Sequence, residues 1–573
     1  MRKLAGLAIA ALLLSGATKP ATYDVPATYD VPATYDVIVR GGTIYDGTGG
    51  APYRGDVAIT KDRIVRVGRV AGRARRTIDA RGLAVAPGFI NMLSWANESL
   101  IADPRGMSDT KQGVTLEVMG EGWSMGPWTP EMARLEESRQ GDIKFKVQWS
   151  TLAGYQNWLT KRGITPNIAS FVGATTVRIH ELGEGDVDPS PEQLGRMQGL
   201  VRAAMNDGAM GLGSSLIYAP ASYAETPELI ALASAAHRCG GMYISHMRSE
   251  GDRLLESVDE LIAISRASGA PAEIYHMKQS GREAWGKYDA MVARIEAARK
   301  AGLRITADMY TYTAGATGLD AAMPTWVQAG GTEKWIERLK DPAIRARVLA
   351  EMRAPAQDWE NLLRNTGSAD KVILLAFKNP ALKPLTGKTL AQVAAMRGKS
   401  PEDTAIDLVI EDGARVGTAY FLMDEANVAK QTALPWVSFG SDAGSQAPEG
   451  VFLKSSTHPR AYGNVARMLG KYVRDERTTS LADAVRRLSG LPASNLGIRD
   501  RGLLKPGNFA DLAIFNPATI ADKATFDKPQ QYAAGMRHVF INGVQVLRDG
   551  AHTGATPGRV VRGPGWRQCP AAR

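Results

Sequence analysis

The sequence predicts an α/β fold: a (β/α)8 TIM-like barrel, a small β-sandwich domain built from both termini, and a helical lid insertion. Three observations support this prediction. About eight apolar runs alternate with helical stretches through the middle, strand-like segments with Gly-rich turns lie near both ends, and a tryptophan-containing helical stretch interrupts the rhythm. At 573 residues the chain is long enough for a large barrel with an added domain.

The first residues have the pattern of a secretory signal peptide. Arg2 and Lys3 precede an apolar run from Leu4 to Leu14, and small residues follow up to Ala17. The apolar run is too short to cross a bilayer, and the absence of cysteine at position 17 argues against a lipid anchor. We therefore expect a periplasmic or secreted protein without a membrane anchor; the alternative is a cytosolic protein with an apolar N-terminus.

Composition changes divide the rest of the chain. A tandem PATYDV repeat predicts an extended linker, and period-two alternation with Gly and Asp turns predicts the β-domain. The expected parts are the signal peptide (1–17), repeat linker (18–35), N-terminal β-domain part (36–85), barrel (86–490) with an insertion at about 314–371, C-terminal β-domain part (491–560) and tail (561–573).

The barrel strands are expected at short apolar runs between helical stretches. In LLESVDELIAISRAS, for example, apolar residues share one helical face and Gly269 supplies the stop. The expected strands are LAVAPGFI, GVTLEVM, either IKFKVQW or NIASFVG, GAMGLGSS, GMYISHM, PAEIYHM, LRITADMY and LPWVSFGSD.

Charge and cysteine content exclude several classes of protein. The formal net charge is +10, but the basic residues are scattered, which favours a solvated surface with a bias toward anionic ligands over nucleic-acid binding. With only two cysteines, Cys239 and Cys569, we expect neither a disulfide framework nor a cysteine-based zinc site.

Two histidines follow apolar runs in the middle of the chain. His246 ends MYISH, His276 ends PAEIYH, and a helical stretch separates the two runs. Because consecutive parallel strands end at the same edge of a barrel, we expect both imidazoles to lie together there. One histidine alone is more often a hydrogen-bonded residue without function, but two at consecutive strand ends favour a metal site.

The ends of other predicted strands add carboxylates to this site. Glu121, Asp308 and Asp442 each stand at such an end. A carboxylate at Asp442 can bind a metal and also exchange a proton with a water whose pKa zinc lowers to about 7. We therefore predict His246, His276 and Asp442 as metal ligands, and Asp442 also as the catalytic residue.

A family resemblance extends over most of the chain. GLGSSLIYAP, ISHMRSEG, IYHMK, TADMYTYTA, FGSD and HPRAYG together resemble the N-acyl-D-amino-acid deacylases (D-aminoacylases) of the amidohydrolase superfamily, and APGFI, QGVT and GNFADLAIFNP also fit. The resemblance covers about residues 36–550. It implies a metal-dependent hydrolase that cleaves the amide bond of N-acyl-D-amino acids, or similar small N-acyl compounds, with metal-activated water.

The chain departs from this family at two metal-binding motifs. The family's His-x-His pair is replaced by LSW at 93–95, and the turn that carries its zinc-binding cysteine is GEGW at 120–123. We predict that Glu121 replaces the thiolate as a metal ligand, with Glu117 as the substitute candidate; the alternative for Glu121 is a loop carboxylate without a metal. Because the His-x-His pair is missing, we expect one Zn²⁺ per chain.

The resemblance also assigns residues to a small substrate with a carboxylate. Arg460 binds that carboxylate with its forked guanidinium, helped by Lys278 and by Tyr310 or Tyr312. A structural ion pair is the alternative for Arg460.

Four further residues are expected around this core. Trp95 and Trp123 reshape the substrate pocket toward a bulky group, Asp308 orients Lys278 or His276 from behind, and His458 orders its loop. Two other functions stay open: a dipeptidase or other amidase with a bulky aromatic substrate, and an inactive ligand-binding protein on an amidohydrolase scaffold. The sequence leaves the acyl group, the chirality and a possible homo-oligomer undecided.

Overall fold

The computed structural model describes residues 34–355 and 359–569. The signal peptide and most of the repeat linker lie outside the described residues. Within the described part, no helix is long and apolar enough to cross a membrane.

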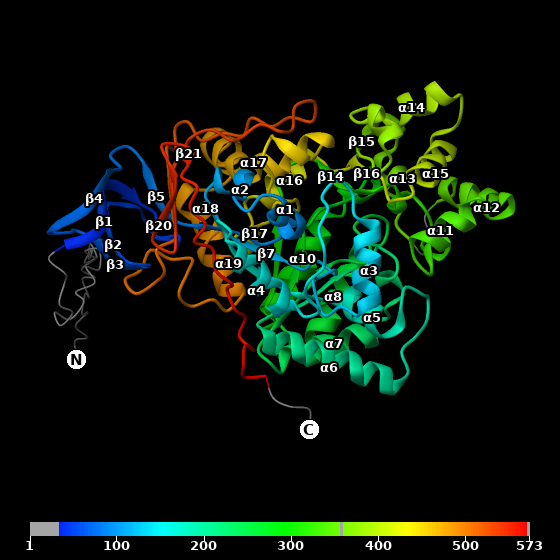
Figure 1. Ribbon diagram of the computed structural model, residues 1–573, viewed down its shortest axis with the longest axis horizontal. Coiled ribbons are helices and arrows are strands. Elements are labelled where there is room, and N and C mark those ends of the chain that lie inside the picture. The colour runs from blue at the N-terminus through cyan, green and yellow to red at the C-terminus, as the bar shows by residue number, and fades with distance from the viewer. Residues whose placement is uncertain (1–33, 356–358, 570–573) are drawn as a thin grey trace, which may run out of the picture.

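Parallel strands form the centre of the molecule (Figure 1). Each is short and almost entirely buried, which suits a parallel sheet covered on both faces. One sheet holds β6 (Phe89–Asn91), β7 (Val114–Met119) and β8 (Asn167–Ser170). The other runs in the order β9 (Val172–Gly173), β10 (Gly211–Ser215), β11 (Met242–His246), β12 (Ala272–Ile274), β13 (Ile305–Met309) and β17 (Val437–Phe439). Of the two alternatives for the third run, NIASFVG supplies strands, β8 and β9.

Amphipathic helices connect these strands and pack against one another. They include α6 (Pro191–Asp207), α7 (Thr226–His237), α8 (Leu254–Ser268) and α10 (Tyr288–Lys300). In α8, Leu254, Val258, Leu261 and Ile262 are buried, and Gly269 ends the helix with a left-handed φ of 76°, as its sequence pattern predicts.

Strands from both ends of the chain share one nine-stranded sheet among the described residues. Strand β18 pairs antiparallel with β5, which joins the two ends, and Val39, Val85, Leu512 and Ile514 contribute to a common apolar cluster. The strands are β1 (Thr34–Ile44), β2 (Tyr53–Thr60), β3 (Arg63–Gly68), β4 (Arg73–Asp79), β5 (Ala84–Pro87), β18 (Leu512–Phe515), β19 (Met536–Ile541), β20 (Val544–Arg548) and β21 (Ala551–His552).

Between β13 and β17 the chain makes a long excursion that differs from the predicted helical segment at 314–371. It begins with a strand, β14 (Ala314–Gly318), and continues to β15 (Val372–Ala376) and β16 (Gly417–Phe421), which together form an antiparallel sheet. The sequence AGATG lacks alternation, and its partner β16 lies far along the chain, so local pattern could not indicate this strand. The helices of the excursion include α11 (Thr332–Leu339), α12 (Pro342–Arg353), α13 (Leu362–Thr366), α14 (Leu390–Arg397), α15 (Pro401–Asp412) and α16 (Glu425–Gln431).

The two cysteines form a disulfide, Cys239–Cys569, which the sequence analysis did not predict. The bridge fastens the C-terminal tail to the turn between α7 and β11. The tail also runs beside β8, because Val560 forms a parallel bridge with Ile168. A single bridge across a separation of 330 residues has no spacing pattern by which sequence could reveal it.

Candidate active site

The predicted site residues meet at the carboxyl ends of the parallel strands. His246 is the last residue of β11, whereas Glu121, His276 and Asp442 follow closely after β7, β12 and β17. His276 and Asp442 have left-handed φ angles of 36° and 50°, a conformation that costs energy outside glycine and that is found at active sites as well as in tight turns. All four side chains are buried or nearly so.

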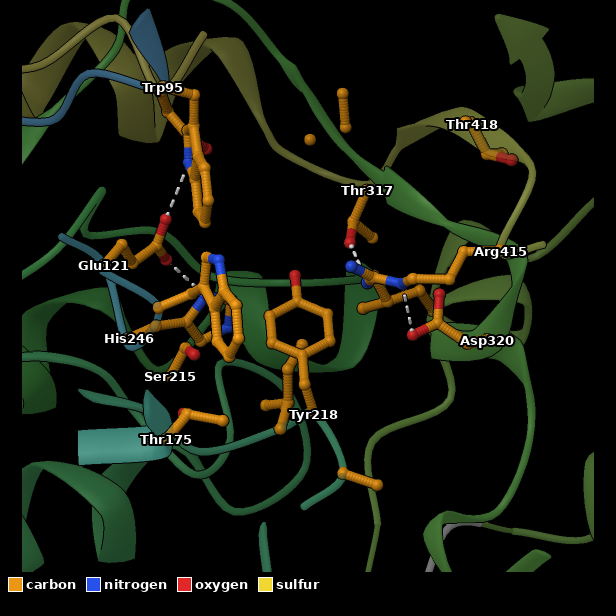
Figure 2. Close-up of a pocket in the computed structure, with 18 of the residues that line it drawn as sticks. Trp95, Glu121, Thr175, Ser215, Tyr218, His246, Thr317, Asp320, Arg415 and Thr418 are labelled. Atoms are coloured by element: carbon orange, nitrogen blue, oxygen red, sulfur yellow. Dashed lines mark hydrogen bonds and ion pairs between the residues drawn. The ribbon is translucent and has the colours of Figure 1, made fainter. Parts of the chain in front are cut away.

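Glu121 lies between the two histidines, and Figure 2 shows its contact with His246. Its Oε1 is 2.8 Å from His276 Nε2 and 3.1 Å from His246 Nδ1, and one donor atom from each of the three residues lies within 4.8 Å of the others. Two imidazole nitrogens and a carboxylate oxygen are a donor set that zinc accepts. Glu117, the substitute candidate, instead accepts a hydrogen bond from Asn91 Nδ2 at 3.0 Å and is outside this group.

The protonation of these residues also suits a cation site. Burial lowers the pKa of His246, which favours the neutral imidazole that a metal requires. Burial opposes ionisation of Glu121, but the neighbouring His276 and His246 lower its pKa overall. Burial and Lys278 act against protonation of His276, yet the carboxylates of Glu121 and Glu250 raise its pKa to about 10. A divalent cation bound to His276 Nε2 would compete with that proton.

Glu250, which the sequence analysis missed, lies behind both histidines. Its Oε1 is 3.1 Å from His276 Nδ1 and 2.7 Å from Lys278 Nζ, and its Oε2 is 3.7 Å from His246 Nε2. These are the ring nitrogens that point away from Glu121. The only signal in the sequence was a carboxylate four residues after His246, in the loop that follows β11, where no strand or helix pattern fixes the direction of a side chain.

Arg460 contacts the carboxylate of Asp442 directly. Its Nη2 is 2.9 Å from Asp442 Oδ2, and its Cζ lies 4.5 Å from the centre of the Tyr310 ring. The Arg460 side chain is 3% exposed, and its Nε and Nη1 have no hydrogen-bond partner within residues 34–355 and 359–569. Lys278 Nζ approaches the same ring to 5.5 Å. Arg460 can therefore receive an anionic group here through its Nε and Nη1. Lys278 adds a second buried positive charge, although its Nζ also lies 2.7 Å from Glu250 and 2.7 Å from His276 Nδ1.

The structure places His458, Asp308 and Tyr312 in supporting positions. His458 Nε2 lies 2.9 Å from the Ala314 carbonyl oxygen and its Nδ1 accepts a hydrogen bond from the Arg460 backbone at 3.0 Å, so it positions the Arg460 segment. Asp308 Oδ1 accepts a hydrogen bond from the His276 backbone at 2.9 Å. Tyr312 donates to Asp522 at 3.1 Å and does not line the cavity described below.

The site opens into a cavity of about 630 Å³. Trp95 and Trp123 both line it, and the Trp95 indole Nε1 lies 3.0 Å from Glu121 Oε2 and 3.1 Å from Asp442 Oδ1. Apolar side chains form much of the remaining wall, among them Met132, Leu135, Ile179, Ile217 and Trp335. Figure 2 shows a further group that the sequence analysis missed, in which Arg415 bonds Asp320 at 2.8 Å and Thr317 at 3.1 Å.

A protein-family model for the amidohydrolase family matches residues 76–547. The chain belongs to the amidohydrolase family. This amidohydrolase is 31% identical to the D-aminoacylase of Alcaligenes xylosoxydans xylosoxydans over 532 residues, which cover 92% of this chain and 97% of the relative. It is 30% identical to the N-acyl-D-glutamate deacylase of the same organism over 529 residues, which cover 92% and 96%. The resemblance seen in the sequence is thereby confirmed, and the protein is a hydrolase that acts on C–N bonds.

Solved structures agree with this assignment. The N-acyl-D-glutamate deacylase of Bordetella bronchiseptica, solved with zinc and a phosphonate inhibitor, matches with a TM-score of 0.77 at 29% identity, covering 92% of this chain and all of that one. A D-aminoacylase matches with a TM-score of 0.76 at 32% identity and the same coverage. A D-aminoacylase structure at 31% identity, with a TM-score of 0.75 and the same coverage, was determined to study a binuclear metal centre. The amidohydrolase fold and its mixed α/β character are thus established.

Proposed function

We propose that this amidohydrolase is a zinc-dependent deacylase that hydrolyses the amide bond of N-acyl-D-amino acids or similar small N-acyl compounds. The observation that supports this proposal most is that a group of metal donors lies next to a buried arginine that can bind a carboxylate. Glu121, His246 and His276 offer three converging metal donors, and Arg460 contacts Asp442 beside them with two guanidinium nitrogens uncommitted among the described residues. The similarity to D-aminoacylases and N-acyl-D-glutamate deacylases supports the choice of substrate.

The protein's own residues have separate tasks in this proposal. Glu121, His246 and His276 would hold one zinc ion, which when bound supplies a Lewis acid and lowers the pKa of water to about 7. Arg460 and Lys278 bind the substrate carboxylate and fix the amide relative to Asp442. Such positioning accounts for a large share of catalysis in hydrolases.

Asp442, which the sequence analysis also expected to bind the metal, is outside the group of three converging donors, and its task in this proposal is to move the proton. Burial raises its pKa, whereas the positive charge of Arg460 acts against that rise, so the carboxylate can both accept a proton from the attacking water and return it to the departing amine. Its Oδ1 and Oδ2 are held by Trp95 and Arg460, which limits rotation of the group during this exchange.

We also infer that the two parallel sheets close into one (β/α)8 barrel. The Met92 backbone donates to the Phe439 carbonyl at 3.1 Å, and Ser94 forms a parallel bridge with Ala443, which connects the first strand to the last. The proposed domain boundaries are those predicted from sequence, except that the lid is the longer excursion between β13 and β17 in place of the segment 314–371. Export to the periplasm or medium is proposed from the signal-like N-terminus, and the Cys239–Cys569 disulfide supports an oxidising compartment.

Cavity size favours a second candidate, an amidase or dipeptidase for substrates with a bulky aromatic group. A cavity of about 630 Å³ with Trp95, Trp123 and Trp335 on its walls exceeds what a small acetyl compound fills. The carboxylate anchor is common to both candidates.

The test combines metal analysis with a substrate panel. Protein purified without added metal is expected to hold one zinc per chain and to hydrolyse N-acyl-D-amino acids faster than their L-isomers. Asp442→Asn is expected to keep the zinc and lose at least about 100-fold in kcat, the lower range for general acid–base catalysis. Exclusive turnover of L-dipeptides would favour the second candidate, and zinc-loaded protein without any amidase activity would indicate the inactive ligand-binding scaffold.

The metal ligand assigned to Glu121 has its own test. Glu121→Ala is expected to weaken zinc binding strongly, whereas Glu117→Gln, a change at a buried carboxylate outside the donor group, is expected to leave it unchanged. Undiminished zinc affinity in Glu121→Ala would remove Glu121 from the ligand set.

A further inference from the structure

Trp95 stands where the family's His-x-His motif ends, and its backbone is fixed between the two strands that carry its side-chain partners. The Trp95 N–H donates to the Ala443 carbonyl at 3.0 Å, the Asp442 N–H donates to the Leu93 carbonyl at 2.9 Å, and the Ser94 N–H donates to Val118 in β7 at 2.8 Å. Backbone hydrogen bonds therefore connect segment 93–95 both to the turn that contains Asp442 and to β7, the strand that precedes Glu121.

The Trp95 side chain joins the two carboxylates. Its single indole N–H is shared between Glu121 Oε2 at 3.0 Å and Asp442 Oδ1 at 3.1 Å, and Figure 2 shows the indole nitrogen directed at Glu121. The second oxygen of Glu121 faces the histidines, and the second oxygen of Asp442 faces Arg460. One donor thus links the metal-binding group to the proton-transfer group.

Two ionised carboxylates in a buried site repel each other unless a positive charge or a hydrogen-bond donor lies between them. In a binuclear metal centre, the second metal ion can supply the positive charge that offsets this repulsion. An indole nitrogen is only a hydrogen-bond donor and offers no lone pair to a metal, and Leu93 offers no ligand either. Where the family has two metal-binding histidines, this chain therefore has Leu93, which offers no ligand, and Trp95, which offers a fixed hydrogen-bond donor.

We propose that Trp95 is a positioning residue whose shared indole N–H holds Glu121 and Asp442 in place of a second metal ion, so that this site takes a single divalent cation. The inference rests on the proposed function only in taking Glu121 as a metal ligand and Asp442 as the proton-transfer group. Trp95 does not need to touch the substrate for this role.

Zinc binding to Trp95→Phe and to a matched control tests the proposal. Phenylalanine keeps an aromatic ring at a position that is 37% exposed and removes the indole N–H together with one of the two fused rings. Trp123→Phe is the control, because Trp123 lines the same cavity and no hydrogen bond within the described residues uses its indole nitrogen. Zinc stoichiometry is measured by elemental analysis, and the dissociation constant by competition with a chelator.

We expect wild-type protein to saturate at one zinc per chain. Trp95→Phe should also bind one zinc but with a dissociation constant about 10- to 100-fold higher, as when a residue that orients a metal ligand is removed. Trp123→Phe should stay within about twofold of wild type. Two zinc ions per wild-type chain, or an unchanged dissociation constant in Trp95→Phe, would overturn the proposal.

A measurement on folded wild-type protein covers the case in which Trp95→Phe does not fold. In protein labelled with ¹⁵N-tryptophan, one indole N–H resonance should lie downfield because of its two carboxylate acceptors and should move in Asp442→Asn. An indole spectrum that is identical in wild type and Asp442→Asn would contradict the shared bond. None of these binding measurements uses a substrate, so a failure to find amidase activity would refute the proposed function and leave the Trp95 inference intact.

Discussion

The ammonium group of Lys278 lies 2.7 Å from the carboxylate of Glu250, and both are buried behind the histidines that offer metal donors. The same carboxylate approaches the outer ring nitrogens of His246 and His276. At 3.1 Å the carboxylate helps to orient the His276 ring, whereas its 3.7 Å separation from His246 is an electrostatic contact and not a hydrogen bond. Glu250 therefore connects the metal site to the cation that is proposed to bind substrate.

Glu250→Gln tests that connection. The amide keeps the size of the side chain but loses the negative charge that lies beside the rings of His246 and His276 and neutralises Lys278. Zinc affinity should therefore fall by about 10- to 100-fold. KM should rise as well, because Lys278 loses its partner. The control is Glu256→Gln on α8, an exposed position that should behave as wild type in both measurements. Zinc affinity equal to wild type in Glu250→Gln would show that Glu250 does not orient the rings.

Arg460→Lys should weaken substrate binding even though the charge is retained. Lysine cannot contact Asp442 and present a fork of donors to a carboxylate at once, so KM should rise by at least about tenfold. A substrate whose carboxylate has been converted to an amide should show much less difference between the two proteins. Arg467→Lys, at a residue that contacts Tyr312 and Asp522 instead, is the control on the same helix, α17 (Arg460–Arg467). An equal loss with both substrates would argue against a carboxylate-binding role.

Glu273 on β12 should make the protein less stable as the pH rises. Burial raises its pKa from 4.5 to about 7. Below pH 4.5 the folded and unfolded states are both protonated at this residue, so it has no effect. Between pH 4.5 and about 7 the folded state retains a proton that the unfolded state has lost, so stability falls across this window, and the loss levels off at about 3 kcal/mol once the pH exceeds both pKa values.

Glu273→Gln removes this cost, and thermal unfolding at two pH values measures it. The amide can still accept hydrogen bonds from Thr306 and Asn495 through its oxygen. The variant should therefore have a higher Tm than wild type at pH 8, with the advantage shrinking toward pH 5. A Tm difference that does not change with pH would mean that Glu273 ionises normally in the folded protein.

Breaking the disulfide should lower stability without changing catalysis. The bridge constrains an unfolded chain over 330 residues, and such links are typically worth about 2–4 kcal/mol. Cys239 lies before the start of β11, at the opposite end of the strand from His246, so kcat should be unaffected. Cys569→Ser and reduced wild-type protein should show the same drop in Tm. An unchanged Tm in both would contradict a stabilising role.

Sequence patterns located the parts of the site that lie at strand ends. His246 and His276 were predicted because each closes an apolar run, and Glu121 because it stands in the turn at 120–123, where the family carries its zinc-binding cysteine. Glu250 escaped prediction because it lies in a loop, where no period fixes the direction of a side chain. The contact of Trp95 with Asp442 joins residues 347 positions apart and depends on how the first and last parallel strands meet.

The same distinction applies to the fold. Parallel strands such as β11 and β13 are continuous apolar runs and were predicted. Strand β14 consists of small residues and exists only because β16 pairs with it after the long excursion. The Cys239–Cys569 bridge is likewise a long-range contact without a local pattern.

The pairing of β5 with β18 has a consequence for how the chain matures. Until Leu512 and the strand it begins have been synthesised, β5 lacks one neighbour, and the apolar side chains of Ile44, Val85 and their cluster lack part of their cover. A nascent or truncated chain thus exposes an open strand edge, which invites pairing with other chains. The protein can complete its fold only after nearly all of it has been made, which favours a chain kept unfolded by chaperones until synthesis ends.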